Sequence, residues 1–196
     1  MCHKKLLFTI HNTPGARPGF IKKDEKMELK ELTTRTLELF CVSSVPDLGK
    51  ALMEHLNDTD SMRDFKEMVD GDLSKDWLQM VYQYYMADRK KEKQDFTPAC
   101  LGKLTSKLVG KTDTFVDMCA GSGALTIQRW TENPDQKFEL YEIDENVTPY
   151  LLYNLALRNV EADVWQGDVL TGDFTARYKV EKGETYGKVT CVKPAV

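Results

Sequence analysis

The second half of the chain alternates short apolar segments with helical ones, and this alternation restricts the possible folds more than any other feature. Four segments have the composition of strands: residues 115–119, 138–142, 162–166 and 188–192. Helical segments separate the first three strands, at residues 124–130 and 149–158. In the second of these, Pro149 suits a first helical turn and three leucines share one side. The pattern predicts an α/β protein with a parallel, doubly wound sheet, whose ligand lies beyond the carboxyl ends of the strands.

The segment from residue 27 to about 93 has apolar residues at helical spacing and predicts three or so amphipathic helices. The apolar positions are Leu29, Leu32, Leu37 and Phe40, then Met62, Phe65, Met68 and Val69, then Trp77, Val81, Tyr84 and Tyr85. Breaks are expected at residues 43–46 and 70–72, and Ser74 suits the cap of the helix that holds Trp77. We expect these helices to pack outside the sheet.

The first 26 residues hold two prolines and two glycines between positions 14 and 19 and show no sustained period, which predicts a flexible tail. A helical pattern begins right after Met27, and the lysine-rich run before it resembles the product of a purine-rich ribosome-binding site. A translation start at Met27 is therefore a hypothesis that mass spectrometry of the natural product would test. The chain is expected to divide into a tail at residues 1–26, a helical region at 27–93 and an α/β domain at 94–196.

The composition is that of a globular protein, with 41% hydrophobic and 30% charged residues. The net charge of -4 lacks the basic excess with which proteins neutralise DNA phosphates, so any hold on DNA is expected to be weak or to come through a partner chain. The five cysteines have no spacing typical of a zinc site, and no apolar run approaches the roughly 20 residues of a membrane helix. We expect a cytoplasmic protein with reduced thiols, no structural metal and no membrane anchor.

The most informative segment, Asp117 to Thr126, is a strand that runs into a glycine turn and then a helix. Gly121 and Gly123 permit backbone conformations and a close approach of ligand that a side chain would block. A dinucleotide fingerprint needs a third glycine or alanine where Thr126 stands, so a pyrophosphate cradle is disfavoured. Taken alone, the segment leaves a tight turn without any ligand open as the alternative.

Acidic residues close the next two strands. Glu142 lies about 20 residues beyond the glycines, where a carboxylate accepts hydrogen bonds from both hydroxyls of a ribose. Ile143 offers an apolar face for an adenine, and Asp168 after the third strand is placed to accept from an exocyclic amino group. Each acid alone could be a turn or cap residue, but their joint position at successive strand ends predicts a nucleoside site.

These segments resemble the N6-adenine DNA methyltransferases, in particular the modification subunit of type I restriction systems, over roughly residues 94–196. Four segments match in order: an F-T-P segment, the D-x-x-x-G-x-G pattern, the ribose-binding acid and a G-D-x-L segment. The matching residues are Phe96, Thr97, Pro98, Asp117, Gly121, Gly123, Glu142, Ile143, Gly167, Asp168 and Leu170. The helical region at 27–93 is similar to the amino-terminal region of those subunits in position and pattern, and Asn154 resembles part of the family's helix after the acid.

The resemblance implies a Rossmann-like, S-adenosylmethionine-dependent methyltransferase fold, truncated and with a mainly parallel sheet, behind an N-terminal helical region. It implies that S-adenosylmethionine or S-adenosylhomocysteine is bound by Phe96, Thr97, Pro98, Asp117, Cys119, Gly121, Ser122, Gly123, Glu142, Ile143, Asp168, Val169 and Leu170. In the family the Thr-Pro region meets the methionine part of the cofactor. Cys119 has no histidine near it in the sequence, so a Cys/His hydrolase is rejected.

The end of the chain departs from the family pattern. In the family the fourth strand ends in Asn-Pro-Pro followed by Tyr or Phe, which accept the adenine amino group and stack on the flipped base. The corresponding residues here are Lys193, Pro194, Ala195 and Val196. Lys193 only donates hydrogen bonds, and Val196 cannot stack as an aromatic ring does. We therefore expect a cofactor-binding protein of this class that does not methylate adenine by itself.

Two alternatives stay open. One is an active DNA adenine methyltransferase subunit, or a fragment of one, that a partner chain completes. The other is a non-enzymatic phage or mobile-element protein that mimics the modification subunit and uses the cofactor as a structural ligand. Since a sheet ending at residues 188–192 would expose an unpaired edge, a homo-oligomer or a restriction-modification partner is expected.

Overall fold

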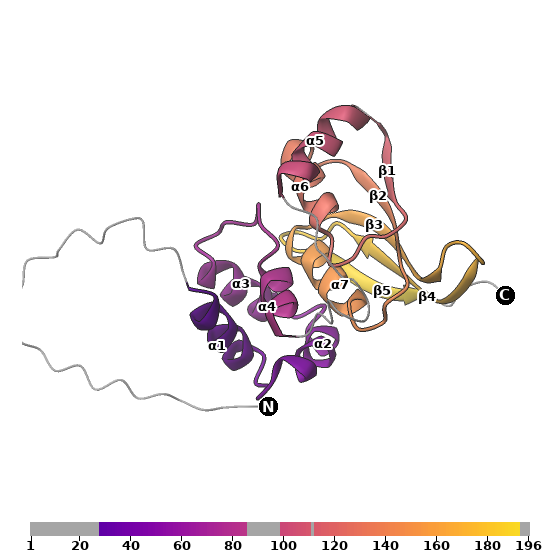
Figure 1. The fold of residues 1–196 in the computed structure, drawn as a ribbon. Coiled ribbons are helices and arrows are strands. Elements are labelled where there is room, and N and C mark those ends of the chain that lie inside the picture. The colour runs from indigo at the N-terminus through magenta and orange to yellow at the C-terminus, as the bar shows by residue number, and fades with distance from the viewer. Residues whose placement is uncertain (1–27, 86–98, 111, 193–196) are drawn as a thin grey trace, which may run out of the picture.

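The computed structural model describes residues 28–85, 99–110 and 112–192. These residues form a five-stranded sheet with helices on one face and a further layer of helices beyond them (Figure 1). The helices are α1 (Leu29–Leu39), α2 (Val45–Glu54), α3 (Thr59–Met68), α4 (Trp77–Tyr85), α5 (Ala99–Val109), α6 (Ala124–Glu132) and α7 (Thr148–Leu157). The strands are β1 (Thr114–Asp117), β2 (Lys137–Glu142), β3 (Glu161–Asp168), β4 (Asp173–Glu181) and β5 (Lys188–Val192).

The sheet is mixed, and its strands follow the order β1-β2-β3-β4-β5. β1, β2 and β3 are parallel, whereas β4 is antiparallel to β3 and β5 is antiparallel to β4. One row of buried side chains crosses all five strands: Phe115, Phe138, Ala162, Val180 and Val189. Side chains alternate between the two faces of a strand, so this row marks the single face that the helices cover.

Helices α6 and α7 connect the three parallel strands. Because right-handed crossovers between strands in sequential order return on the same side, both helices cover the same face of the sheet. The layer α1 to α4 lies beyond α7 (Figure 1). All ten residues of α7 are buried, since the sheet covers one side of the helix and the helical layer covers the other.

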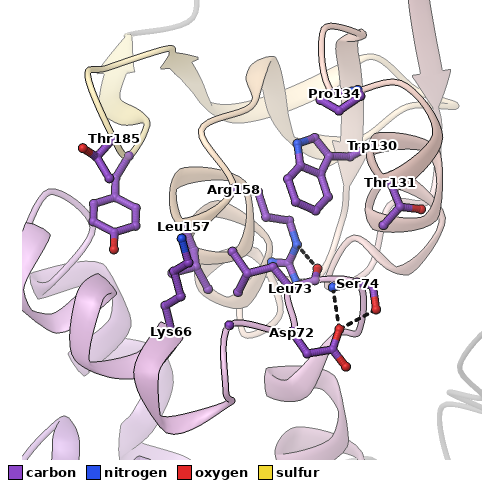
Figure 2. Close-up of a pocket in the computed structure, with 12 residues that line it drawn as sticks. Lys66, Asp72, Leu73, Ser74, Trp130, Thr131, Pro134, Leu157, Arg158 and Thr185 are labelled. Carbon is purple, nitrogen blue, oxygen red and sulfur yellow. Dashed lines mark hydrogen bonds between the residues drawn. The ribbon is translucent and has the colours of Figure 1, made fainter.

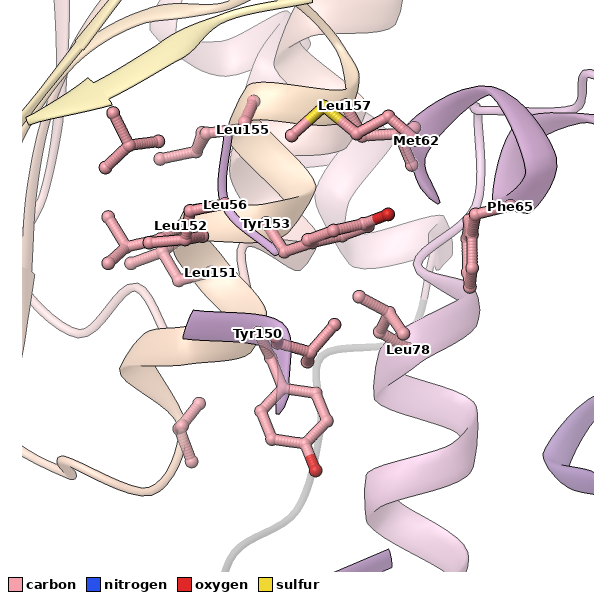
Figure 3. Close-up of a cluster of buried hydrophobic side chains, with 14 of the residues drawn as sticks. Leu56, Met62, Phe65, Leu78, Tyr150, Leu151, Leu152, Tyr153, Leu155 and Leu157 are labelled. Carbon is pink, nitrogen blue, oxygen red and sulfur yellow. The ribbon is translucent and has the colours of Figure 1, made fainter. Parts of the chain in front are cut away.

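Leucine, methionine and aromatic side chains fill the contact between α7 and the helical layer (Figure 3). Tyr150 packs edge-on against Tyr82, and Tyr153 packs edge-on against Phe40 and Phe65, with ring centroids 4.9 to 6.0 Å apart. The buried apolar residues of the helical layer, of α7 and of the sheet form one connected core. This shared core fixes the helical layer against the α/β part of the chain.

The prediction of helices in residues 27–93 is confirmed for α1, α3 and α4. The predicted break at residues 43–46 is confirmed for Ser43 and Ser44, but Val45 and Pro46 already belong to α2, a helix that was not predicted, and a proline in the first turn costs no hydrogen bond. The cap of α4 is Asp76 and not Ser74, because an oxygen of Asp76 accepts from the Gln79 N–H at 2.9 Å. Helix α5 was not predicted, and the predicted tail at residues 1–26 lies outside the described residues.

The prediction of a mainly parallel sheet is confirmed for β1, β2 and β3 and wrong for β4 and β5, which are antiparallel to their neighbours. The doubly wound arrangement is also wrong for the described residues, because their helices cover one face of the sheet (Figure 1). β4 was missed although Ala176, Tyr178 and Val180 alternate with polar residues. A β-bulge in β4, opposite Gln166 and Gly167 of β3, shifts the alternation of its side chains between the two faces by one residue. β5 forms where it was predicted, but it pairs with β4, which puts it at the opposite edge of the sheet from β1.

Candidate functional site

The carboxyl ends of β1, β2 and β3 lie together because the three strands are parallel. We call this side of the sheet the carboxyl edge, which is distinct from the outer strands β1 and β5. Asp117 ends β1, Glu142 ends β2 and Asp168 ends β3, so the fold brings the three predicted acids to the same edge. Large apolar side chains at this edge are unusually exposed: Met118 by 59%, Ile143 by 66% and Leu170 by 92%. An edge that combines acids with uncovered apolar groups has the composition of a ligand crevice.

The glycine turn joins β1 to α6. Its entry is fixed by the Ala120 N–H, which donates to the Tyr141 carbonyl of β2 at 2.9 Å. Gly121 and Gly123 both have left-handed backbone, with φ of 56° and 99°. A Cβ on Gly123 would lie 3.1 Å from the Leu151 side chain, whereas a Cβ on Gly121 would meet nothing within 4 Å. Gly123 therefore allows the start of α6 to lie close to Leu151 of α7, and Gly121 borders open space.

Glu142 is buried, and both of its carboxylate oxygens accept hydrogen bonds from the backbone. One oxygen accepts from the Gly121 N–H and the other from the Asp144 N–H, each at 2.7 Å. Burial raises the pKa of Glu142, and these two backbone donors act against that rise. A carboxylate has about four lone-pair positions, so Glu142 is able to accept a further hydrogen bond. Through its hydrogen bond from the Gly121 N–H, Glu142 also holds the glycine turn against the end of β2.

Three buried side-chain polar atoms in the described residues have no hydrogen-bond partner: Oδ2 of Asp117, Oγ1 of Thr126 and Nε2 of Gln79. Asp117 precedes the glycine turn, and Thr126 follows it in the first turn of α6. Gln79 lies in α4, and its N–H donates to Asp76, the residue that accepts from the Ser122 hydroxyl. The other oxygen of Asp117 accepts from the Cys119 N–H at 3.1 Å. Burial raises the pKa of Asp117. Unsatisfied buried groups are rare in folded proteins, and two of these three, in Asp117 and Thr126, flank the glycine turn.

The remaining predicted residues of this edge have more local roles. An oxygen of Asp168 accepts from the Leu170 N–H at 2.8 Å and so stabilises the turn between β3 and β4. Val169 is half-buried and Cys119 is exposed. Phe96, Thr97 and Pro98 lie outside the described residues.

The side chain of Ser122 points away from the edge. Ser122 is 2% exposed, and its hydroxyl donates to Asp76 at 2.6 Å. Only its backbone is therefore offered to a ligand. Sequence reasoning missed Asp76: an aspartate directly before an apolar helix is a cap signal, but nothing local connects it to a residue 46 positions further along the chain.

The residues that correspond to the family's base-binding motif, Lys193, Pro194, Ala195 and Val196, lie outside the described residues. The strand that precedes them, β5, belongs to the described residues. β5 is separated from β1 by three strands, which at ~4.8 Å per strand puts it about 19 Å from β1. The end of β5 is therefore far from the glycine turn.

A separate hollow of about 490 Å³ lies away from this edge (Figure 2). Trp130 near the end of α6, Arg158 after α7 and Tyr186 before β5 contribute to its lining. In the described ranges no three His, Cys, Asp or Glu side chains converge in a way that could hold a metal ion, and no helix has the length and apolar character to cross a membrane.

The fold and these residues define an α/β protein with a candidate ligand site at the carboxyl edge of three parallel strands, beside a glycine turn. Comparison with known families gives the particular relationship: the model of the N-6 DNA methylase family matches residues 73–186, more than half of the chain. The chain belongs to the N-6 DNA methylase family. The match includes Asp76, α4, the glycine turn and all three acids. Searches of curated proteins and of solved structures returned no match.

Proposed function

We propose that the chain is a methyltransferase-like protein that binds S-adenosylmethionine or S-adenosylhomocysteine at the glycine turn, in a Rossmann-like domain related to type I modification subunits. The observation that carries the proposal is Oδ2 of Asp117, which is buried without a hydrogen-bond partner at the entry of the glycine turn, four residues before Gly121, where a Cβ would meet nothing within 4 Å. A positively charged ammonium of the ligand would satisfy that oxygen. In the bound state, S-adenosylmethionine supplies a transferable methyl group on its sulfonium.

The residues at the edge fit an adenosyl group. Glu142 has spare lone pairs for the ribose hydroxyls, and Ile143 beside it is 66% exposed, which suits contact with the adenine ring. Asp168 uses one oxygen within its own turn, so its other oxygen would accept from the adenine amino group. Thr126 stands where a pyrophosphate cradle needs a smaller residue, which favours a ligand without a diphosphate.

Binding without independent adenine methylation is part of this proposal. Lys193 replaces the acceptor asparagine of the family, and Val196 replaces the stacking aromatic residue. β5, the strand before Lys193, lies about 19 Å from β1 and is therefore far from the glycine turn, where the methyl donor would bind. This separation supports the same conclusion. The purified chain with S-adenosylmethionine labelled in its methyl group and adenine-containing DNA is expected to transfer no label.

A second candidate function is that of a methyltransferase subunit completed by a partner chain. Among the described residues, β1 is an edge strand, which pairs with β2 on one side and with no strand on the other. Helix α5 next to this edge in the sequence exposes Leu101, Leu104 and Leu108 by 49, 51 and 78%. Exposed apolar side chains and an open strand edge are typical of a protein contact surface. Methyl transfer that appears only after mixing with a restriction-modification subunit would support this candidate.

The binding proposal is tested by thermal unfolding with S-adenosylhomocysteine. At 100 times the dissociation constant, a ligand that binds only the folded state stabilises it by about 2.7 kcal/mol, which shifts the melting temperature by several degrees. ATP is the matched control because it shares the adenosine but carries a triphosphate. We expect a shift with S-adenosylhomocysteine and none with ATP. No shift with S-adenosylhomocysteine at millimolar concentration would refute the proposal.

A further inference from the structure

A chain of buried hydrogen bonds joins the helical layer to the glycine turn. It begins at Asp76, which caps α4 and is 7% exposed. One carboxylate oxygen of Asp76 accepts from the Ser122 hydroxyl at 2.6 Å. The other accepts from the Asn154 side-chain amide of α7 at 2.8 Å, besides the N–H of Gln79. Both oxygens are thus occupied, and the contact spans elements far apart in the sequence.

Asn154 and Arg158 close this chain of bonds. The Asn154 amide also donates to the Ser122 carbonyl at 3.0 Å, so Ser122 is held through both its side chain and its backbone. Arg158 donates to the Asn154 side-chain oxygen at 2.9 Å. It donates as well to the carbonyls of Leu73 and Lys75, in the loop that carries Asp76 (Figure 2 shows Arg158 and Leu73).

The two charged side chains in this chain of hydrogen bonds, Asp76 and Arg158, are buried. Burial raises the pKa of Asp76, and the hydrogen bonds from Ser122 and Gln79 and the charge of Arg158 act against it. Burial lowers the pKa of Arg158 to about 10, and the charge of Asp76 opposes that. Two buried charges cost desolvation energy that their attraction at best repays, so they add little net stability. The apolar contacts of Tyr150 and Tyr153 already bind α7 to the helical layer.

The buried hydrogen bonds of Asp76 add little net stability, and apolar contacts already join α7 to the helical layer. This combination indicates that the hydrogen bonds fix the geometry of the glycine turn. Ser122 stands between Gly121, which borders the open space, and Gly123, which begins α6. We propose that Asp76 is a positioning residue of the ligand site: the helical layer, through Asp76 and Asn154, holds Ser122 and thereby sets the shape of the glycine turn. The identity of the ligand in this inference rests on the proposed function.

Ser122→Ala is the first test, because it removes one hydroxyl from the turn and leaves the cap of α4 in place. Ser61→Ala is the matched control: Ser61 is also buried and meets the Tyr153 hydroxyl of α7 at 3.3 Å, away from the turn. By isothermal titration with S-adenosylhomocysteine, we expect Ser122→Ala to bind about tenfold more weakly than wild type, and Ser61→Ala to bind as wild type does. Equal affinities in both variants would overturn the proposal.

Substitutions of Asp76 give a second, graded test. In Asp76→Asn the side-chain oxygen still accepts from Gln79 and Asn154, and the new amide donates to the Ser122 hydroxyl, which is able to accept. Asp76→Ala offers none of these partners. We expect Asp76→Asn to stay within about threefold of the wild-type affinity and Asp76→Ala to fall by tenfold or more. A loss in Asp76→Asn as large as that in Asp76→Ala would contradict the inferred role.

Hydrogen exchange gives a readout that needs no ligand. We expect the amides of Gly121, Ser122 and Gly123 to exchange at least tenfold faster in Ser122→Ala than in Ser61→Ala, with the two variants alike in the rest of the sheet. Wild-type protein that fails to bind S-adenosylhomocysteine would refute the proposed ligand only. Unchanged exchange at the turn would refute the positioning role, whatever the ligand.

Discussion

Replacing Gly121 by alanine would separate ligand binding from the stability of the turn. Gly121 has a φ of 56°, and a Cβ there would meet no heavy atom within 4 Å. The cost to folding is therefore confined to the left-handed backbone, about 1–2 kcal/mol. The hydrogen bond from the Gly121 N–H to Glu142 belongs to the backbone and is retained.

Gly123→Ala is the matched control for this change. The φ of Gly123 is 99°, and its new methyl would lie 3.1 Å from Cδ1 of Leu151, a residue with no exposed surface. Overpacking of a core adds about 1–3 kcal/mol to the backbone strain. Gly123→Ala is therefore expected to lose about 2–5 kcal/mol of unfolding free energy, clearly more than Gly121→Ala.

Urea unfolding and isothermal titration measure the two effects separately. Because the methyl of Gly121→Ala projects into the open space beside the turn, this variant is expected to fold and yet to bind S-adenosylhomocysteine at least about tenfold more weakly, which corresponds to about 1.4 kcal/mol. Wild-type affinity in Gly121→Ala would show that the ligand does not lie against the turn. A stability loss as large as in Gly123→Ala would show that the space is not open.

Three further variants test other parts of the structure. Glu142→Ala leaves the N–H groups of Gly121 and Asp144 without acceptors, so urea unfolding should show a loss of about 2 kcal/mol and titration a loss of S-adenosylhomocysteine binding; a fully stable variant would contradict the hydrogen bonds to Glu142. Burial raises the pKa of Asp117 above its ordinary 3.8, so the wild-type folded state binds the proton more tightly than the unfolded state and loses stability as the pH rises from 3.8 through the folded pKa. Asp117→Asn removes that loss, and its unfolding free energy relative to wild type should be higher at pH 7 than at pH 4; a pH-independent difference would argue against the shifted pKa. Leu108 is 78% exposed, so Leu108→Lys should change the unfolding free energy by less than about 0.5 kcal/mol and still abolish association seen by light scattering or capture of a partner subunit; association that survives the change would place the contact elsewhere.

Local pattern was enough to locate most of the elements that form the site. The strands that became β1, β2 and β3, the helices α6 and α7, and the glycine turn all follow from periodicity and turn chemistry within a few residues. Parallel pairing of those three strands follows from their alternation with helices, and it alone brings Asp117, Glu142 and Asp168 to one edge. The membership in the N-6 DNA methylase family rests on the same segment of the chain.

Contacts between distant residues decided the rest. The antiparallel direction of β4 and of β5 depends on how the chain returns after the strand before each, which leaves no periodic signal, and the bulge opposite Gly167 interrupts the alternation of β4. The full burial of α7 depends on the helical layer, since the three leucines on one side predict only a one-sided helix. The sequence analysis placed the cap of α4 at Ser74, and only the tertiary structure shows that Asp76 is the cap and that its carboxylate also reaches Ser122. Hydrogen bonds between residues tens of positions apart are selected by packing of the whole chain, so the sequence by itself determined the turn and its acids, and the tertiary structure decided what holds them in place.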